Sequence, residues 1–440
     1  MVAVALVVSR GAWADAPAGA PELTLAEAVR LAMQNSHAVC VAALEVQRAE
    51  DRVAAARARR LPSLDFQATA GTTLAPVRVS FPGGAFGTYP VIGPIPATDT
   101  IVEAPRTVSG NVTASATQPL TQLHKIGLGT KMNELGREVE RAMLQEERTA
   151  TATEVRRLYY QLLQAESAAK AKEEEVEVYR ELDRVVQEQV AAEVALPSDG
   201  LDVQARLAGA EYDLAAIRGD VATGRQRMNL YLGRALDTEF ALVAVPGTSP
   251  EEADLPAAVA RALERRPDLT QARLAVEQAD VDRRLKKAES IPDVSLAVTY
   301  TSFVNVDLLP RNVAMAGVQV KWEPFDWGRK GKERAEKEIQ LEQARSAARD
   351  AADRVRIDVA DRFRKLHEAR LLVEAERLGR DAAREKLRVV ASRRGQDAAL
   401  LKDLLEAQAS LSGAAAEYDR ALMTFWTAKA DFEKAIGEEL

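Results

Sequence analysis

An internal duplication constrains the fold of this chain more than any other feature of its sequence. Residues 25–62 recur without a gap at residues 255–292. The recurring positions are Leu25, Ala28, Val29, Ala32, Ala42, Leu44, Val46, Ala49, Ala58 and Pro62, which return as Leu255, Ala258, Val259, Ala262, Ala272, Leu274, Val276, Ala279, Ala288 and Pro292. Two copies are too few for a solenoid array. The repeat therefore predicts a pseudo-symmetric body made of two similar halves.

Prolines divide the chain into short and long segments. Eight of the 18 prolines fall within residues 62–119, whereas none lies within residues 120–196 or after Pro324. Because proline breaks helix interiors, these proline-free stretches predict two helices of roughly 100 Å each, at 1.5 Å per residue.

Each long helix is expected to fold back into an antiparallel hairpin. Turn sequences interrupt the pattern at residues 197–200 and 394–397. Gly233 and Gly437 each follow the last apolar residue of a second helix, as C-caps do. The predicted hairpins cover residues 125–233 and 328–437. An apolar stripe with steps of three and four supports the helix in the second half: Val355, Val359, Phe363, Leu366, Ala369 and Val373.

Apolar and polar residues alternate in four segments that occupy matched places in the two halves. Such alternation is typical of strands with one apolar and one polar face. The predicted strands are residues 62–74, 108–119, 292–302 and 313–324. The segments 75–107 and 303–312 that connect them are expected to be surface loops without structure of their own. Four strands cannot close a barrel, so a membrane-crossing sheet of this kind would need several chains.

Composition narrows the classes of function. The net charge of -7 gives no basic surface for nucleic acid, and Cys40, the single cysteine, excludes an internal disulfide and a cysteine zinc site. The three histidines have no ligand spacing, and no catalytic motif is present. We therefore expect no metal, no cofactor and no enzymatic activity. No apolar run reaches the 18 residues that a transmembrane helix needs. Residues 1–14 are interpreted as the remnant of a secretory signal, or alternatively as a disordered apolar tail.

The junction between the last strand and the last long helix resembles a known family. Residues 317–329 contain an alternating strand, then Pro324, Phe325, a short turn, and Gly328 with Arg329 at the start of the helix. This pattern resembles the TolC-like outer membrane efflux protein family. The first copy, at Pro119, lacks the turn and the Gly-Arg pair. The resemblance extends from about residue 22 to residue 437.

The resemblance implies a mostly α-helical homotrimer in the bacterial outer membrane. Its 12-stranded transmembrane β-barrel would continue into a periplasmic α-helical barrel. The first structural repeat would span residues 15–233, an equatorial linker residues 234–254, and the second repeat residues 255–440. The implied partners are a periplasmic adaptor (membrane fusion) protein, an inner membrane transporter and outer membrane lipid. The chain would be a passive exit duct for efflux or type I secretion, with its cargo unspecified.

The resemblance also places the hairpin turns at a periplasmic constriction where partners dock. Asp202 and Asp403 are candidates for the gate, with Asp199 and Asp397 behind them. Rings of such carboxylates in three copies would favour cations; alternatively, these residues only cap helix N-termini. The predicted docking tips and strand-to-helix junction residues are Leu196, Pro197, Gly200 and Gly395, and Pro119, Pro324, Gly328 and Arg329.

A second hypothesis is a soluble periplasmic coiled-coil scaffold of the adaptor type. It would share the helical hairpins and the acidic balance of charge. It would not need four matched amphipathic strands or the long Pro/Gly-rich connection between the first two.

Overall fold

The computed structural model describes residues 21–438, except 73, 75–76, 105–107, 195, 250–253, 306–309, 395 and 397–399. The predicted signal remnant therefore lies outside the described residues. The chain forms two compact units. The helical unit takes its residues from Met1–Ala49, Gly136–Glu277 and Glu342–Leu440, and the strand unit from Glu50–Leu135 and Gln278–Leu341. Each unit thus draws on both halves of the duplication.

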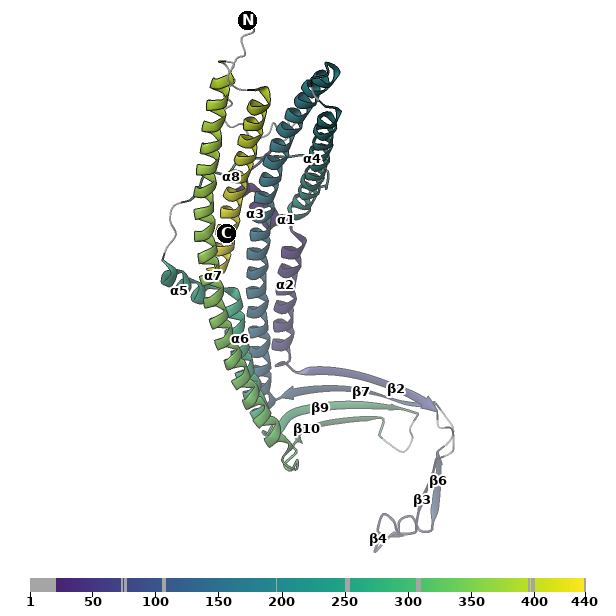
Figure 1. Ribbon diagram of the computed structural model, residues 1–440. Helices are drawn as coiled ribbons and strands as arrows, with labels where there is room; N and C mark the ends of the chain where they lie inside the picture. Colours follow the sequence, from purple (N-terminus) through teal and green to yellow (C-terminus); the bar gives the residue numbers. More distant parts are fainter. Residues whose placement is uncertain are drawn as a thin grey trace. The chain divides into compact units, whose positions relative to one another are not determined.

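The two halves share a succession of two helices, two strands and a long helical hairpin, and the first half carries further short strands between its two strands (Figure 1). The first half has α1 (Leu25–Asn35), α2 (His37–Ala58), β2 (Ser63–Thr72), β7 (Val108–Pro119), α3 (Gln122–Ala191) and α4 (Pro197–Leu232). The second half has α5 (Leu255–Arg265), α6 (Pro267–Ala288), β9 (Asp293–Val304), β10 (Asn312–Lys321), α7 (Arg329–Arg394) and α8 (Leu401–Ala435). The first two helices of the halves correspond residue for residue, so the sequence repeat is a structural repeat.

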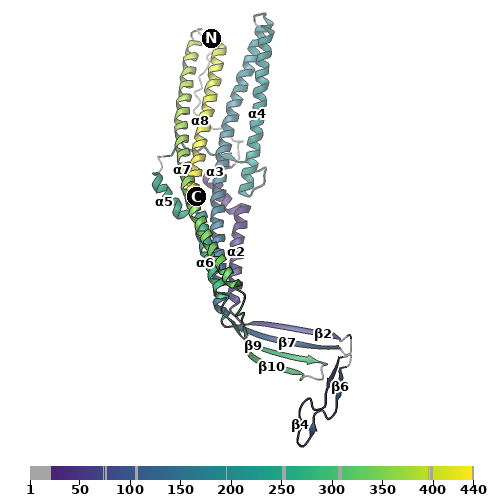
Figure 2. The ribbon, with the colours of Figure 1, turned by 60° about the horizontal axis from the view of Figure 1, so that its bottom comes forward.

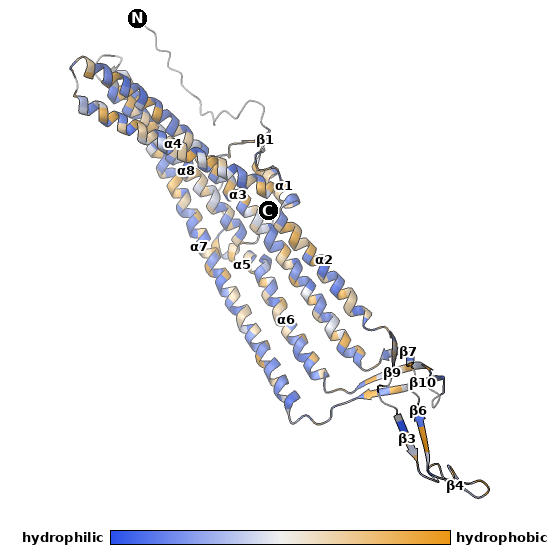
Figure 3. Ribbon diagram, turned by 90° about the vertical axis from the view of Figure 1, so that its right-hand side faces the viewer, coloured by the Kyte–Doolittle hydropathy of each residue, from blue (hydrophilic) through white to orange (hydrophobic). Residues whose placement is uncertain are grey.

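Two long antiparallel hairpins, α3 with α4 and α7 with α8, make up most of the helical unit (Figures 1 and 2). Ion pairs hold α4 to α3, including Arg225 with Glu166 and Arg218 with Glu173, each at 2.8 Å. Polar and apolar residues are mixed along the helices (Figure 3). The stripe predicted on α7 is confirmed, because Val355, Val359, Leu366, Ala369 and Val373 are buried and Phe363 packs against their cluster.

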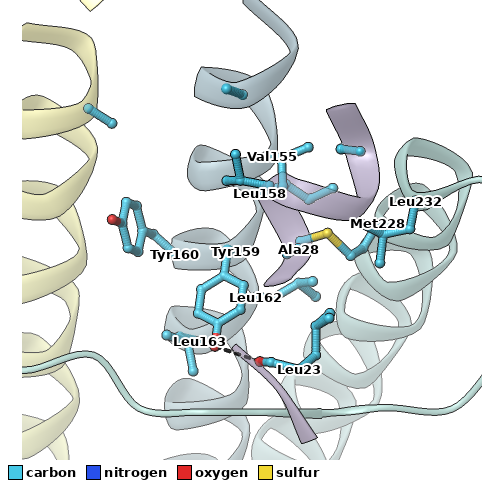
Figure 4. Close-up of a cluster of buried hydrophobic side chains, with 14 of the residues drawn as sticks. Leu23, Ala28, Val155, Leu158, Tyr159, Tyr160, Leu162, Leu163, Met228 and Leu232 are labelled. Atoms are coloured by element: carbon cyan, nitrogen blue, oxygen red, sulfur yellow. Dashed lines mark hydrogen bonds between the residues drawn. The ribbon is translucent and has the colours of Figure 1, made fainter. Parts of the chain in front are cut away.

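A second cluster of buried side chains surrounds Tyr159 of α3 (Figure 4). The Tyr159 hydroxyl lies 2.9 Å from the carbonyl oxygen of Leu23 and 2.7 Å from that of Val243, and it accepts the Val243 N–H at 3.0 Å. Burial raises the pKa of Tyr159 to about 12, so the hydroxyl keeps its proton. Tyr159 thereby fastens a small parallel ribbon of β1 (Glu22–Leu23) and β8 (Ala241–Leu242).

The strand unit contains a four-stranded antiparallel sheet in the order β10-β9-β7-β2. The central pair, β7 with β9, joins the two halves of the duplication. β2 and β10 are the edge strands, and among the described residues each has a partner on one side only.

The segment between β2 and β7 is not the structureless loop that its prolines and glycines suggested. It contains β3 (Val77–Phe81) paired with β6 (Thr100–Ala104), and β4 (Thr88–Tyr89) paired with β5 (Gly93–Pro94). Arg78 faces Glu103 across the pair of β3 and β6 at 3.3 Å, and the Phe81 and Phe86 rings lie 5.1 Å apart. The alternation within five-residue strands was too short to be recognised among the turn residues.

Candidate functional site

The four-stranded sheet has one mainly apolar face and one mainly polar face, and Val313 and Met315 are apolar residues on the polar face. One cross-strand row is Phe66, Ala114, Tyr300 and Ala314; the neighbouring row on the opposite face is Gln67, Thr113, Thr301 and Val313. The Thr113 and Thr301 hydroxyls are 3.2 Å apart on the polar face. Large apolar side chains on the other face are exposed: Leu64, Phe66, Leu296, Val298, Tyr300, Val318 and Val320. An exposed apolar face of this kind suits lipid.

The first strand-to-helix junction uses side chains in place of the family turn. Pro119 ends β7, and α3 begins at Gln122. The Thr121 hydroxyl donates to the carbonyl oxygen of Pro292 at 2.7 Å and accepts the Val294 N–H at 2.8 Å. Lys125 then binds Asp293 at 2.6 Å. These contacts attach the start of α3 to the beginning of β9.

The second junction is a tight turn built on Asp326. Its two carboxylate oxygens accept the N–H groups of Gly328 at 3.1 Å and Lys330 at 2.9 Å. The hydrogen bond from Lys330 is the main reason that the pKa of Asp326 is lowered. Gly328 has φ of 84°, a conformation that favours glycine. Pro324 precedes the turn, and Arg329 follows it with ion pairs to Glu323 at 2.7 Å and Glu333 at 3.2 Å.

The tips of the two hairpins start their second helices in the same way. The Leu196 N–H donates to Asp199 at 3.2 Å, and the Leu400 N–H donates to Asp403 at 3.1 Å. Asp199 and Asp403 are thus equivalent residues, each at the third position of its helix. Both act as helix-capping groups, which is the alternative that the sequence left open.

Asp202 has a different environment from Asp403. It lies one turn further along α4 and binds Arg206 of the same helix at 3.1 Å, with both side chains exposed. It makes no capping contact among the residues that the structure describes. Asp397 and Gly395 lie outside the described residues. A role of Asp202, Asp403, Asp199 or Asp397 in a gate stays a prediction.

Apolar side chains project into solvent at both tips. Leu196, Leu201 and Leu400 are 66%, 67% and 68% exposed. Pro197 forms the first residue of α4 and limits the backbone there. Gly200 is buried against α3, where an added Cβ would lie 3.0 Å from Gln187 Nε2. The described residues of the tips therefore present exposed leucines to solvent.

Two contacts between the hairpins were not foreseen. Ser167 of α3 donates to Asp419 of α8 at 2.5 Å, and Ser412 of α8 donates to Glu174 of α3 at 2.6 Å. Burial raises the pKa of Asp419, and the Ser167 hydroxyl opposes that effect. Each pair joins residues more than 200 positions apart, so no pattern in a single sequence could have indicated it.

A network of ion pairs surrounds a surface hollow of about 300 Å³ near the C-terminal end of α8. Asp431 of α8, with its side chain 12% exposed, binds Arg157 of α3 at 2.5 Å and Arg362 of α7 at 2.9 Å. Arg266 binds Asp358 at 2.6 Å and Asp268 at 2.8 Å. Acids and bases balance here, so the network joins helices rather than attracting ions of one sign.

The described part of the chain lacks two kinds of site. It contains no group of three or more His, Cys, Asp or Glu residues that could hold a metal ion. None of its helices combines the length and the apolar composition needed to cross a bilayer.

Solved structures of outer membrane channels share this fold. The chain resembles the outer-membrane channel OprN (TM-score 0.74, 17% identity, covering 94% of this chain and 90% of that one). It resembles the Campylobacter jejuni channel CmeC with a TM-score of 0.75 and 14% identity, covering 94% of this chain and 85% of that one. It also resembles the open state of the Neisseria gonorrhoeae channel MtrE with a TM-score of 0.70 and 17% identity, covering 94% of this chain and 88% of that one. No curated protein sequence matches it.

The sequence profile of one family covers both halves of the duplication. The family described as "Outer membrane efflux protein" matches residues 28–234 and 258–438. The two matched segments leave out only the ends and the linker between the halves. This confirms the resemblance noted at the strand-to-helix junction: the chain belongs to the outer membrane efflux protein family.

Proposed function

We propose that this chain is the exit duct of a tripartite export system and acts as a passive conduit rather than as an enzyme. The observation that carries the proposal is the separation of faces on the four-stranded sheet, where exposed apolar side chains lie opposite hydroxyl and amide groups. Such a sheet can have lipid on one side and water on the other. A soluble scaffold would not need such a sheet.

The edges of the sheet support assembly from several copies. In the part of the chain that the structure describes, β2 and β10 each have no strand on their outer side. Unpaired backbone groups are too costly in hydrocarbon, so the edges need strands from other copies. Three copies would supply twelve strands, the number expected from the family resemblance, and would gather the helical hairpins around one axis.

Partners of this duct are proposed from the hairpin tips. The exposed leucines at the tips, Leu196, Leu201 and Leu400, fit a helical adaptor protein in the periplasm. The energy for transport would come from an inner membrane transporter, because the chain shows no catalytic or nucleotide-binding motif. The acidic residues near the tips, Asp202 and Asp403 above all, would favour cations at the narrow end.

Three measurements test the proposal. Cells that lack the protein should become sensitive to drugs, dyes, detergents or metals, or should fail to secrete a protein, and the wild-type gene should restore the phenotype. In mild detergent the protein should behave as a trimer of 47.8 kDa chains and should conduct ions in planar bilayers. Recovery in the soluble periplasm without detergent would favour the scaffold instead.

A further inference from the structure

The two edge strands carry opposite charges that have no ionic partner among the described residues. Asp65 lies on the polar face of β2, and its one hydrogen-bond partner in the described part of the chain is the Ser63 hydroxyl, at 3.2 Å. Lys321 ends β10 and forms no ion pair with a described residue. The carboxylate directly across from it, Asp293, is already bound to Lys125 at 2.6 Å.

The direction of the strands permits these edges to meet. Each pair in the series β10-β9-β7-β2 is antiparallel, so β10 runs opposite to β2. β10 of one copy can therefore pair antiparallel with β2 of the next copy. Side chains alternate between faces, and Asp65 and Lys321 both belong to the polar face. The polar face stays continuous only when odd-numbered residues of β2 oppose odd-numbered residues of β10.

We infer that copies of this chain join through β10 and β2 in the register that sets Lys321 of one copy opposite Asp65 of the next. This inference rests on the proposed assembly of several chains. The register pairs Gln319 with Gln67 on the polar face. On the apolar face it pairs Val320 with Phe66, Val318 with Ala68 and Ala316 with Ala70. An aromatic residue opposite a β-branched residue and opposite charges together are favourable cross-strand pairs.

The stagger of this register fits a closed barrel. Within one chain, a row across the sheet runs from Asp65 through Ser115 and Thr299 to Met315. At the joint, Met315 then faces Gly71 of the next copy, so the row advances by six residues per copy. For three copies this corresponds to strands tilted by roughly 45°, with about 3.3 Å per residue and about 4.8 Å between strands. A joint without stagger gives no tilt, and a stagger in the other direction leaves β2 and β10 without overlap.

Cysteine pairs test the register directly. Cys40 is the single cysteine of the chain and is exposed, so Cys40→Ser provides the background. Gln67→Cys with Gln319→Cys places two thiols opposite each other across the joint. Mild oxidation should convert trimers into covalently linked trimers on non-reducing gels. The matched control, Gln67→Cys with Gly317→Cys, corresponds to a register shifted by two residues and should link at least tenfold less. Stronger linking in the control would overturn the inference.

Charge exchange tests the ion pair. Asp65→Lys should put two lysines across each joint and lower the fraction of heat-resistant trimer by about 2- to 5-fold per joint. Adding Lys321→Glu should restore it, whereas Lys321→Gln should restore it only in part. Independent effects of the two changes would contradict the pair. If trimers form and conduct but show neither linking nor rescue, the inference fails while the proposed function stands; if no trimer forms in the wild type, both fail.

Discussion

The Ser167 hydroxyl on α3 donates a hydrogen bond of 2.5 Å to Oδ2 of Asp419 on α8. This contact joins the first hairpin to the second near the middle of α8. Further along, Ser412 of α8 donates to Glu174 of α3 at 2.6 Å. Any movement that separates the hairpins of one chain must break both bonds.

Removal of the first hydroxyl should loosen the hairpins. Ser167→Ala leaves the half-buried Asp419 carboxylate without its donor, and hydrogen bonds to charged groups contribute about 1.5–3 kcal/mol. We expect higher single-channel conductance or more frequent opening in planar bilayers, together with a lower melting temperature. Ser410→Ala on the exposed side of α8 is the control and should leave both unchanged. Wild-type conductance in Ser167→Ala would show that this contact does not restrain the channel.

The link should also depend on pH. Burial raises the pKa of Asp419, so the folded state binds more protons than the unfolded state. The contribution of Asp419 to the free energy of unfolding is therefore fully present below the ordinary aspartate pKa of about 4. It is lost as the pH rises through the raised pKa of the folded state. Asp419→Asn should be more stable than the wild type at pH 7–8 and equal to it near pH 4. Melting curves across this range give the comparison. Ser167→Ala should widen the pH range over which stability changes, because the Ser167 hydroxyl lowers the pKa of Asp419.

The two gate candidates can be separated because one of them caps a helix. Asp403→Ala should lower helix stability by about 0.5–2 kcal/mol, since Asp403 accepts the Leu400 N–H. Asp202 has no capping bond in the described structure, so Asp202→Ala should leave stability nearly unchanged. If both carboxylates line the constriction, each variant should reduce cation selectivity and weaken block by divalent cations. Unchanged reversal potentials in both variants would show that Asp202 and Asp403 have only a local structural role and do not select ions.

The charge network at Asp431 should matter for stability. Asp431→Asn removes the carboxylate shared by Arg157 and Arg362, and we expect a loss of about 2 kcal/mol, reduced by the partial exposure of the arginines. Asp353→Asn removes an exposed pair with Arg356 and should cost at most about 0.5 kcal/mol. Thermal unfolding of the purified trimers measures both. Equal losses of stability in the two variants would mean that the shared carboxylate of Asp431 contributes no more than an exposed ion pair.

Docking at the tips can be tested without disturbing the fold. Leu201→Asp introduces a charge where an exposed leucine would contact the adaptor. It should lower adaptor binding at least tenfold, and cells with this variant should be as sensitive to drugs as cells that lack the protein. Gln204→Asp adds the same charge on the exposed side of the same helix and should retain export. Trimer formation should persist in both variants. Normal export by Leu201→Asp would place the docking surface elsewhere.

Local patterns in the sequence predicted the main elements of the fold. The two long hairpins follow from proline-free stretches, and the four strands follow from alternation that repeats between Leu64 and Val320. These features arise from neighbouring residues, so they can be read from one chain. The apolar and polar faces were also predictable, because alternation fixes them before any partner strand is known. Family membership supports the predicted place in the outer membrane, with the helices in the periplasm.

Contacts that depend on three-dimensional packing could not be predicted in this way. The bond between Ser167 and Asp419 and the shared carboxylate of Asp431 join separate helices, and single polar residues carry no signal of their partners. The pair of β3 and β6 was missed because its strands are short. The equivalence of Asp199 with Asp403 appeared only when their capping bonds were compared, since the tips differ in sequence at Pro197 and Gly200.

The Tyr159 hydroxyl links the start of the first repeat to the segment that follows it. It holds β1, at residues 22–23, to β8, at residues 241–242, through the carbonyl oxygens of Leu23 and Val243. During synthesis the first of these strands therefore has no partner until more than 200 further residues have emerged. Contacts so distant in sequence form slowly, because a long loop must close first. The first half therefore does not complete its packing with its own residues alone, because its first strand pairs with the segment that leads into the second half.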